Sequence, residues 1–128
     1  MSILRVTDIR SNGSTFNDVV TFANSGGTQN GKMCRAFVNF DVNGSVRASF
    51  NVNSVTDNGT GSWTVNFANA LSDANGCVQY SNNREEYNYP YNPNQYVGSI
   101  SASNTGVYNW VETVGTFDSN QNFVSVFR

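Results

Sequence analysis

Short runs of alternating apolar and polar residues, separated by Asn-Gly steps, constrain this chain more than any other feature. The steps begin at five positions, Asn12, Asn30, Asn43, Asn58 and Asn75. An Asn-Gly step supplies the positive φ angles that tight hairpin turns require, and a period of two places alternate side chains on opposite faces of a strand. The chain also contains 16 Val but only 2 Leu, a balance that favours strands over helices. The sequence therefore predicts an all-β protein.

Two hairpins are predicted in the middle of the chain. In the strand before the first turn, one side carries Ala36, Val38, Phe40 and Val42, and the other carries Phe37, Asn39 and Asp41. This strand should turn at Asn43-Gly44 into a second strand, and one side of that strand carries Val46, Ala48, Phe50 and Val52. The second hairpin should close at Asp57-Asn58-Gly59, and the returning strand should point Trp63, Val65 and Phe67 into the core. Three consecutive antiparallel strands follow from these turns.

Further strands are predicted over residues 77–81, 96–102, 108–113 and 122–127, which brings the total to about seven or eight. Only residues 68–73 have a pattern that fits a helical turn. The predicted fold is an antiparallel β-sandwich or jelly-roll-like domain with an extended N-terminal arm, and a small barrel is the competing closure. In this scheme residues 1–31 form the arm and a flexible link, and residues 32–128 form the β-sandwich domain.

The charge pattern disfavours several partners. Of 128 residues 7 are basic and 9 are acidic, with a formal net charge of −2, so nothing indicates the broad cationic face that nucleic-acid phosphate requires. No stretch approaches the apolar length of a membrane span or a signal peptide. We therefore expect no contact with nucleic acid or membrane, and a chain that stays soluble in the cell that makes it. Cys34 and Cys77 are predicted to be reduced thiols that pack as small apolar residues.

The chain contains no histidine, which removes the commonest general base and metal ligand. The single lysine, Lys32, lies in a Gly-rich link, and the adjacent acids Glu85 and Glu86 point to opposite sides of an extended chain. Neither a Ser-Lys arrangement nor a pair of glycosidase carboxylates is therefore favoured. Residues 57–59 offer too few oxygen ligands for calcium. We predict no enzymatic activity, no cofactor and no metal site.

The segment from Tyr80 to Tyr96 contains five of the six tyrosines and both prolines. Tyrosine offers a large, stiff contact area with a polar tip, and proline lowers the entropy lost when a loop becomes ordered. We predict contact with another protein chain, while glycan contact and packing against the chain's own sheet remain alternatives. The candidate contact residues are Tyr87, Tyr89, Tyr91 and Tyr96. By contrast, Trp63 and Trp110 are predicted to anchor the core.

The first ten residues interleave charged residues among apolar ones and have no pairing partner nearby in the sequence. They are predicted to form a strand or an extended arm, which needs a partner. Strand addition to another chain would supply one. The candidate binding residues of the arm are Ile3, Leu4, Val6 and Ile9.

Five short strings between Arg35 and Val78 are informative together: RAFVNF, RASFNV, TDNGTG, TVNF and DAN. In combination they resemble a module of virion structural and tail-fibre-like proteins of tailed bacteriophages, of the kind found in cyanophages and marine phages. The likeness is strongest over residues 35–78, and the N-terminal arm resembles the opening of such proteins more weakly. Residues after Val78, including the tyrosine-rich segment, lie outside the pattern. The family offers no catalytic residues to carry over.

This resemblance implies a non-enzymatic structural protein of a phage virion, assembled in the host cytoplasm. A short chain with one domain suits a position directly on the shell, so we expect a capsid decoration or cement protein that binds the major capsid protein, or another virion protein, and its own copies. Virion analogy suggests a homotrimer. Two alternatives remain open: a short tail or head fibre that binds a host surface glycan, and, more remotely, a small polysaccharide-cleaving enzyme.

Overall fold

The computed structural model describes the backbone of residues 19–24, 27–83, 94–111 and 115–128, and the side chains of residues 33–83, 95–110 and 115–128. The chain divides into two units, Met1–Met33 and Cys34–Arg128. All regular structure in the described residues is β-strand, which confirms the all-β prediction. None of these residues belongs to a helix that is long and apolar enough to span a membrane.

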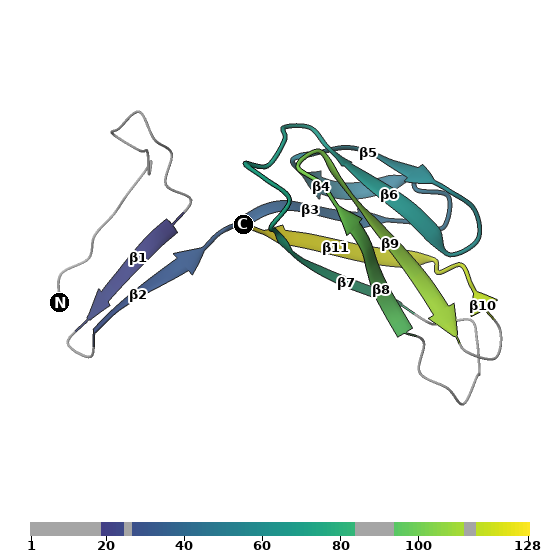
Figure 1. Cartoon of the computed structure of the whole chain (residues 1–128). Helices are drawn as coiled ribbons and strands as arrows, with labels where there is room; N and C mark the ends of the chain where they lie inside the picture. Colours follow the sequence, from purple (N-terminus) through teal and green to yellow (C-terminus); the bar gives the residue numbers. More distant parts are fainter. Residues whose placement is uncertain (1–18, 25–26, 84–93, 112–114) are drawn as a thin grey trace. The chain divides into compact units, whose positions relative to one another are not determined.

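In the smaller unit, β1 (Val19–Asn24) and β2 (Gly27–Lys32) form an antiparallel hairpin (Figure 1). The sequence predicted a flexible link up to residue 31, and this expectation is wrong for the residues of β2, which pair with β1 along their whole length. A ladder of backbone hydrogen bonds does not require apolar side chains. The polar composition of this segment therefore concealed a strand.

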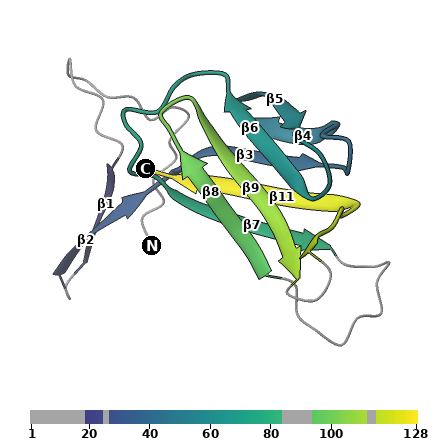
Figure 2. The same cartoon turned by 45° about the vertical axis from the view of Figure 1, so that its right-hand side comes forward.

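The larger unit consists of two antiparallel sheets. The first has the order β4 (Val46–Phe50), β3 (Cys34–Phe40), β11 (Gln121–Phe127) and β7 (Cys77–Asn83). The second has the order β5 (Val52–Asp57), β6 (Ser62–Phe67), β9 (Asn104–Val111) and β8 (Asn94–Ile100), and the short β10 (Gly115–Thr116) pairs with the end of β9. The sheets pack face to face, as Figures 1 and 2 show from two directions. The predicted β-sandwich is confirmed.

The hydrophobic core lies between these sheets and draws alternate residues from their strands. Its buried members are Ala36, Val38, Phe40, Trp63, Val65, Phe67, Leu71, Val107, Val124 and Val126. The Trp63 side chain is only 1% exposed, and its ring meets that of Phe40 edge-on, with 5.7 Å between the centroids. The indole Nε1 donates a hydrogen bond to the carbonyl of Val42 at 3.0 Å. The predicted core side of the strand over residues 62–67 is therefore confirmed.

Both predicted turns are present. At the first, the Asp41 carboxylate accepts hydrogen bonds from the backbone amides of Asn43 and Ser45, each at 2.9 Å. Gly44 has a φ of 76°, and a Cβ there would lie 3.0 Å from the carbonyl oxygen of Val55, so both the backbone conformation and the space favour glycine. At the second turn, the amide of Gly59 donates to the Asp57 carboxylate at 2.8 Å.

The predicted strand over residues 46–52 is wrong in one respect, because it breaks at Asn51. This residue has a φ of 54°, which asparagine tolerates better than most residues. Its side-chain amide donates to the carbonyls of Arg35 and Asn69, each at 3.1 Å, and so fixes the corner. β4 and β5 consequently enter different sheets, and the three strands do not form one meander. No helical turn forms over residues 68–73, and the described residues contain eleven strands instead of seven or eight.

Candidate functional site

Only one of the eight predicted contact residues can be located. Seven lie outside the described residues: Ile3, Leu4, Val6, Ile9, Tyr87, Tyr89 and Tyr91. The eighth, Tyr96, lies on β8, and its side chain is 37% exposed. Its ring stacks on that of Tyr108 in β9, with 5.0 Å between the centroids and 11° between the ring planes. The structure therefore places Tyr96 in an aromatic group that the sequence analysis did not predict.

Trp110 extends this group along β9. It follows Tyr108 by two residues, so both side chains leave the same face of the strand. The Trp110 side chain is 42% exposed, and its predicted role as a core anchor is wrong. The reason is the phase of β9, which points its other alternate residues, Thr105, Val107 and Asn109, into the interior. We call the set Tyr96, Tyr108 and Trp110 the Tyr-Trp face.

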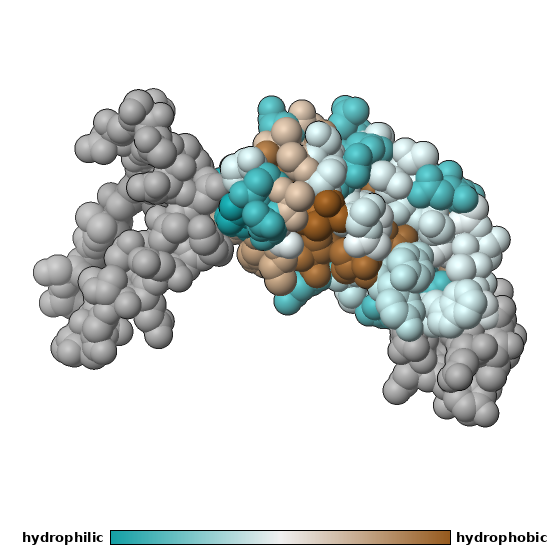
Figure 3. All heavy atoms as spheres, viewed as in Figure 1, coloured by the Kyte–Doolittle hydropathy of each residue, from teal (hydrophilic) through white to brown (hydrophobic). Residues whose placement is uncertain are grey.

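Neutral polar residues occupy the rest of this sheet face. The Asn66 amide donates to the hydroxyl of Thr56 at 3.0 Å and to that of Ser54 at 3.2 Å. The Asn58 amide donates to the Thr64 hydroxyl at 2.9 Å. The side of the larger unit seen in Figure 3 carries mostly pale and hydrophilic residues, with a group of hydrophobic ones among them. Hydrogen bonds between side chains therefore order the polar surface that accompanies the Tyr-Trp face.

A second aromatic group lies on the outward side of the other sheet. Phe37 on β3 is directly opposite Phe50 on β4, and their rings are 6.2 Å apart at an angle of 27°. Phe123 on β11 is opposite Asn39 on β3, in the row next to Phe37. The exposed fractions of Phe37, Phe50 and Phe123 are 43%, 54% and 40%. We call these three residues the Phe face.

A hollow of about 750 Å³ accompanies the Phe face. Six of its lining residues hold outward positions on β3, β7 and β11: Phe37, Asn39, Gln79, Ser81, Phe123 and Ser125. Gln95 and Val97 of β8, in the second sheet, also line it. No described residue that lines the hollow is charged. The side-chain oxygen of Asn39 is buried and has no hydrogen-bond partner among the described residues. A buried acceptor without a donor costs about 1–3 kcal/mol, so this atom requires an explanation.

A polar cluster lies inside the sandwich and is structural. The Tyr80 hydroxyl on β7 is 2.7 Å from the side-chain oxygens of both Asn109 on β9 and Asn122 on β11. The Asn82 amide also donates to Asn109, at 2.6 Å. Burial raises the pKa of Tyr80 above its ordinary value, so the phenol stays protonated at neutral pH. The cluster joins the two sheets through neutral groups and supplies no ionised catalytic side chain.

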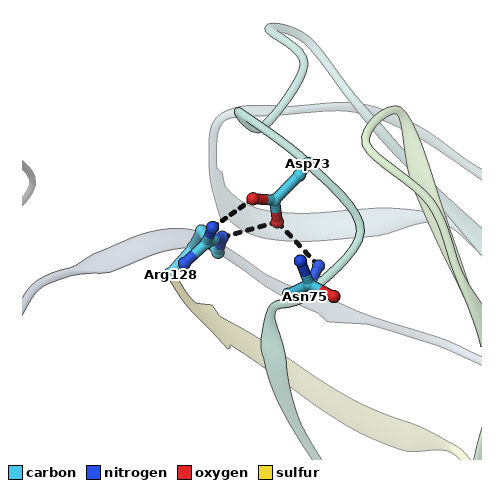
Figure 4. Close-up of polar contacts among 3 residues, drawn as sticks. All are labelled: Asp73, Asn75 and Arg128. Atoms are coloured by element: carbon cyan, nitrogen blue, oxygen red, sulfur yellow. Dashed lines mark hydrogen bonds and ion pairs between the residues drawn. The ribbon is translucent and has the colours of Figure 1, made fainter.

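An ion pair ties the loop between β6 and β7 to the end of β11 (Figure 4). The Arg128 Nε donates to Asp73 Oδ1 at 2.6 Å, its Nη2 pairs with Oδ2, and the Asn75 amide donates to Oδ1 at 2.8 Å. The hydrogen bond from Arg128, supported by that from Asn75, lowers the pKa of Asp73 from 3.8 to about 2. These contacts explain the low pKa of Asp73. Their role is structural, because they hold the loop against the end of β11.

The cysteines differ in their surroundings. Both are free thiols. Cys34 is half-buried and donates a hydrogen bond from Sγ to the carbonyl of Ala36 at 3.1 Å, whereas Cys77 is exposed, so its predicted burial is wrong. Cys77 lies on the edge strand β7, where its side chain points away from the core. In the described part of the chain, no three His, Cys, Asp or Glu side chains come together to hold a metal ion.

Comparisons with protein-family models, with curated proteins and with solved structures find no match to this chain. The two aromatic faces are therefore the features of the described residues that bear most directly on function. The sequence contains a sign of the Phe face, because Phe37 alternates with Ala36 and Val38 and so lies on the opposite side of its strand from these core residues. No comparable signal marked Tyr108 and Trp110, since either alternating set of β9 contains apolar residues.

Proposed function

We propose that this chain is a non-enzymatic structural protein of a phage virion, a capsid decoration or cement protein that binds the shell and its own copies. The observation that carries the attachment is the exposure of Tyr96 and Trp110 beside Tyr108 on one sheet face. Tyrosine and tryptophan are enriched among the residues that dominate the energy of protein interfaces. The virion context is supported by the resemblance over residues 35–78.

The surroundings of these rings suit attachment to another protein. Stacking holds Tyr96 and Tyr108 in one arrangement before binding, which reduces the side-chain entropy lost on association. The neighbouring hydroxyl and amide groups already form hydrogen bonds within the sheet, and they are neutral. A partner that covers them does not have to remove water from a charge, which is the most costly part of burying a polar surface. A homotrimer on the shell is part of the proposal.

The test measures attachment to capsids. The full chain is mixed with capsids of the source phage that lack it, and binding is followed by co-sedimentation. The double variant Tyr96→Ala/Trp110→Ala should bind at least about 30-fold more weakly, the loss typical of interface hot spots. Phe50→Ser on the other sheet is the matched control and should bind like the wild type.

Two results would contradict this proposal. Equal binding by the double variant and the wild type would remove the Tyr-Trp face from the attachment. Gold-labelled antibody against the chain that marks no part of purified virions would overturn the structural role itself. Light scattering of the purified chain, with and without capsids, measures the number of copies that associate.

A further inference from the structure

We propose that the Asn75-Gly76 step, in the loop between β6 and β7, is a site of spontaneous deamidation. The reaction converts the side-chain amide of Asn75 to a carboxylate and so adds one negative charge beside the ion pair of that loop. It requires only this chain and water, and it therefore does not depend on the proposed attachment to a capsid. Backbone and side chains are both described for the Asn-Gly steps that begin at Asn43, Asn58 and Asn75, and the fold protects these steps unequally.

The chemistry of an Asn-Gly step sets two structural requirements. The backbone nitrogen of the glycine loses its proton to hydroxide and attacks the side-chain carbonyl carbon of the asparagine, which forms a C–N bond and closes a succinimide ring. The side-chain nitrogen leaves as ammonia, with a proton taken from water, and a second water molecule then opens the ring to give aspartate or isoaspartate. The glycine amide must therefore have no acceptor, and the asparagine side chain must be able to turn towards it. Glycine hinders this closure least, because it has no Cβ.

The two hairpin turns do not meet these requirements. At the first turn, the amide of Gly44 donates to the carbonyl oxygen of Asp41 at 3.0 Å. At the second turn, the side-chain amide of Asn58 is held by the Thr64 hydroxyl at 2.9 Å. The amide of Gly59 is held as well, by the carboxylate of the same turn. Each turn must therefore open before its asparagine can react, and the hydrogen bonds that open slow the reaction.

The step at Asn75 lacks this protection. Asn75 is exposed, and Gly76 precedes the first residue of β7, so it takes no part in the ladder of that strand. The amide of Gly76 donates no hydrogen bond to any described residue. The bond from the backbone amide of Asn75 to Asp73 holds the asparagine and leaves the reacting nitrogen unbound (Figure 4). Arg128 engages both oxygens of the Asp73 carboxylate and so balances a negative charge that would oppose loss of the amide proton.

Packing keeps a glycine after Asn75. A Cβ at position 76 would lie 2.9 Å from Cδ1 of Ile100 and 3.3 Å from Cγ1 of Val126, two side chains of the core and its margin. Gly44 and Gly59 have positive φ angles, whereas Gly76 does not, so space and not backbone conformation favours glycine at position 76. The core therefore retains, next to an exposed asparagine, the residue type that hinders ring closure least.

The experiment incubates the purified full chain at neutral pH and follows each step by mass spectrometry of its peptides. Trypsin isolates Asn43 in the peptide 36–47, and chymotrypsin then separates Asn58 from Asn75. A sample taken at the start corrects for deamidation during digestion. The same chain unfolded in guanidinium gives the rate that the local sequence alone sets. The ratio of the unfolded rate to the folded rate should be at least about threefold smaller at Asn75 than at either turn, an effect of the size expected for one hydrogen bond.

A pair of variants tests the cause of the protection. Thr64→Val removes the acceptor that holds the Asn58 side chain, and it should accelerate deamidation at Asn58 about twofold or more in the folded chain without changing the rate at Asn75. Thr56→Val is the matched control, because this hydroxyl accepts from Asn66 on the same sheet face. It should leave the rates at all three steps unchanged. Circular dichroism and melting curves show that both variants are folded.

Two results would overturn the assignment. If the ratio of unfolded to folded rates at Asn75 equalled or exceeded that at either hairpin turn, the unbound amide of Gly76 would confer no reactivity. If Thr64→Val and Thr56→Val both left the rate at Asn58 unchanged, hydrogen bonds of the turn would not be what protects an Asn-Gly step in this fold.

Discussion

The two outward faces of the sandwich use aromatic rings in different ways. On the Tyr-Trp face, the rings of Tyr96 and Tyr108 are nearly parallel and 5.0 Å apart. On the Phe face, Phe37 and Phe50 are 6.2 Å apart, and Phe123 lies diagonally across from Phe37 on the next strand. The nearly parallel pair is already packed in one arrangement, whereas the rings of the Phe face are less closely packed on one another. The two faces therefore differ in how much of their aromatic surface is ordered before any contact is made.

The hydrophobic core forms without the side chains of either aromatic face. Alternate residues of β3, β6, β9 and β11 complete the core from the inward side. The cluster around Tyr80 then joins β7, β9 and β11 through hydrogen bonds. The outward residues of the same strands are therefore free to be selected for binding, and substitutions there should affect binding more than folding.

The largest expected effect is the difference in stability between alanine substitutions of the two tryptophans, Trp63 and Trp110. Trp63→Ala removes a ring that is 1% exposed and should lower the free energy of unfolding by about 3–5 kcal/mol, because it leaves a cavity. Trp110→Ala removes a ring that is 42% exposed and should change the free energy of unfolding by no more than about 1 kcal/mol. Urea denaturation of both variants measures the difference. Comparable losses would mean that Trp110 supports the core and is not available to a partner.

The next effect concerns the cluster that holds the two sheets together. Tyr80→Phe deletes the one hydroxyl that can donate to the side-chain oxygen of Asn109 or of Asn122. The free energy of unfolding should fall by about 1–3 kcal/mol, as expected for unsatisfied buried polar groups. Ser125→Ala, which removes a hydroxyl from the outward side of β11, is the control and should have a much smaller effect. If the two variants were equally stable, the cluster would have no role in joining the sheets.

A smaller effect compares the ring pairs themselves. In double-mutant cycles with alanine, the Tyr96/Tyr108 pair should show a coupling of about 0.5–1.5 kcal/mol, the range for well-stacked aromatic pairs. The Phe37/Phe50 pair is more distant and less parallel, so its coupling should lie at the low end of this range, near about 0.5 kcal/mol. Chemical denaturation of the single and double variants provides both values. A larger coupling for the phenylalanine pair would reverse the comparison.

The smallest expected effect concerns the stability of the protein at acidic pH and depends on Asp73, which belongs to neither face. The pKa of Asp73 is lowered to about 2 from 3.8, so its stabilising contribution is fully present above pH 3.8 and is lost as the pH falls through about 2. The melting temperature of the wild type should exceed that of Asp73→Asn at pH 7, and the difference should shrink between about pH 4 and pH 2. Because the pair is partly exposed, added salt should also reduce the difference. A difference that is constant down to pH 2 would contradict the role of this ion pair.

Turns and alternation made part of this fold predictable. The turn at residues 57–59 and the buried positions Trp63, Val65 and Phe67 follow from local chemistry, since an Asn-Gly step and a period of two act over only a few residues. The break at Asn51 was not predictable in the same way. It depends on carbonyl groups of Arg35 and Asn69, which are distant in the sequence.

The candidate site was less predictable than the fold. Whether Trp110 is buried depends on the phase of β9, and that phase is set by pairing with β6 and β8 and by the packing of Val107. Alternation alone does not show which of two apolar sets points inward. The hollow beside Phe123 depends in addition on β11 lying between β3 and β7, and such long-range pairing leaves no mark in local sequence.

The corner at Asn51 also bears on how such a protein can change over generations. Because it separates β4 from β5, gaining or losing one residue within β4 would reverse which of its side chains point outward, yet leave the phase of β5 and the second sheet as they are. Every residue of β4 is exposed, so that reversal would not disturb the interior. Sequence variation in this strand would then alter one outward surface of the domain and leave the other unchanged.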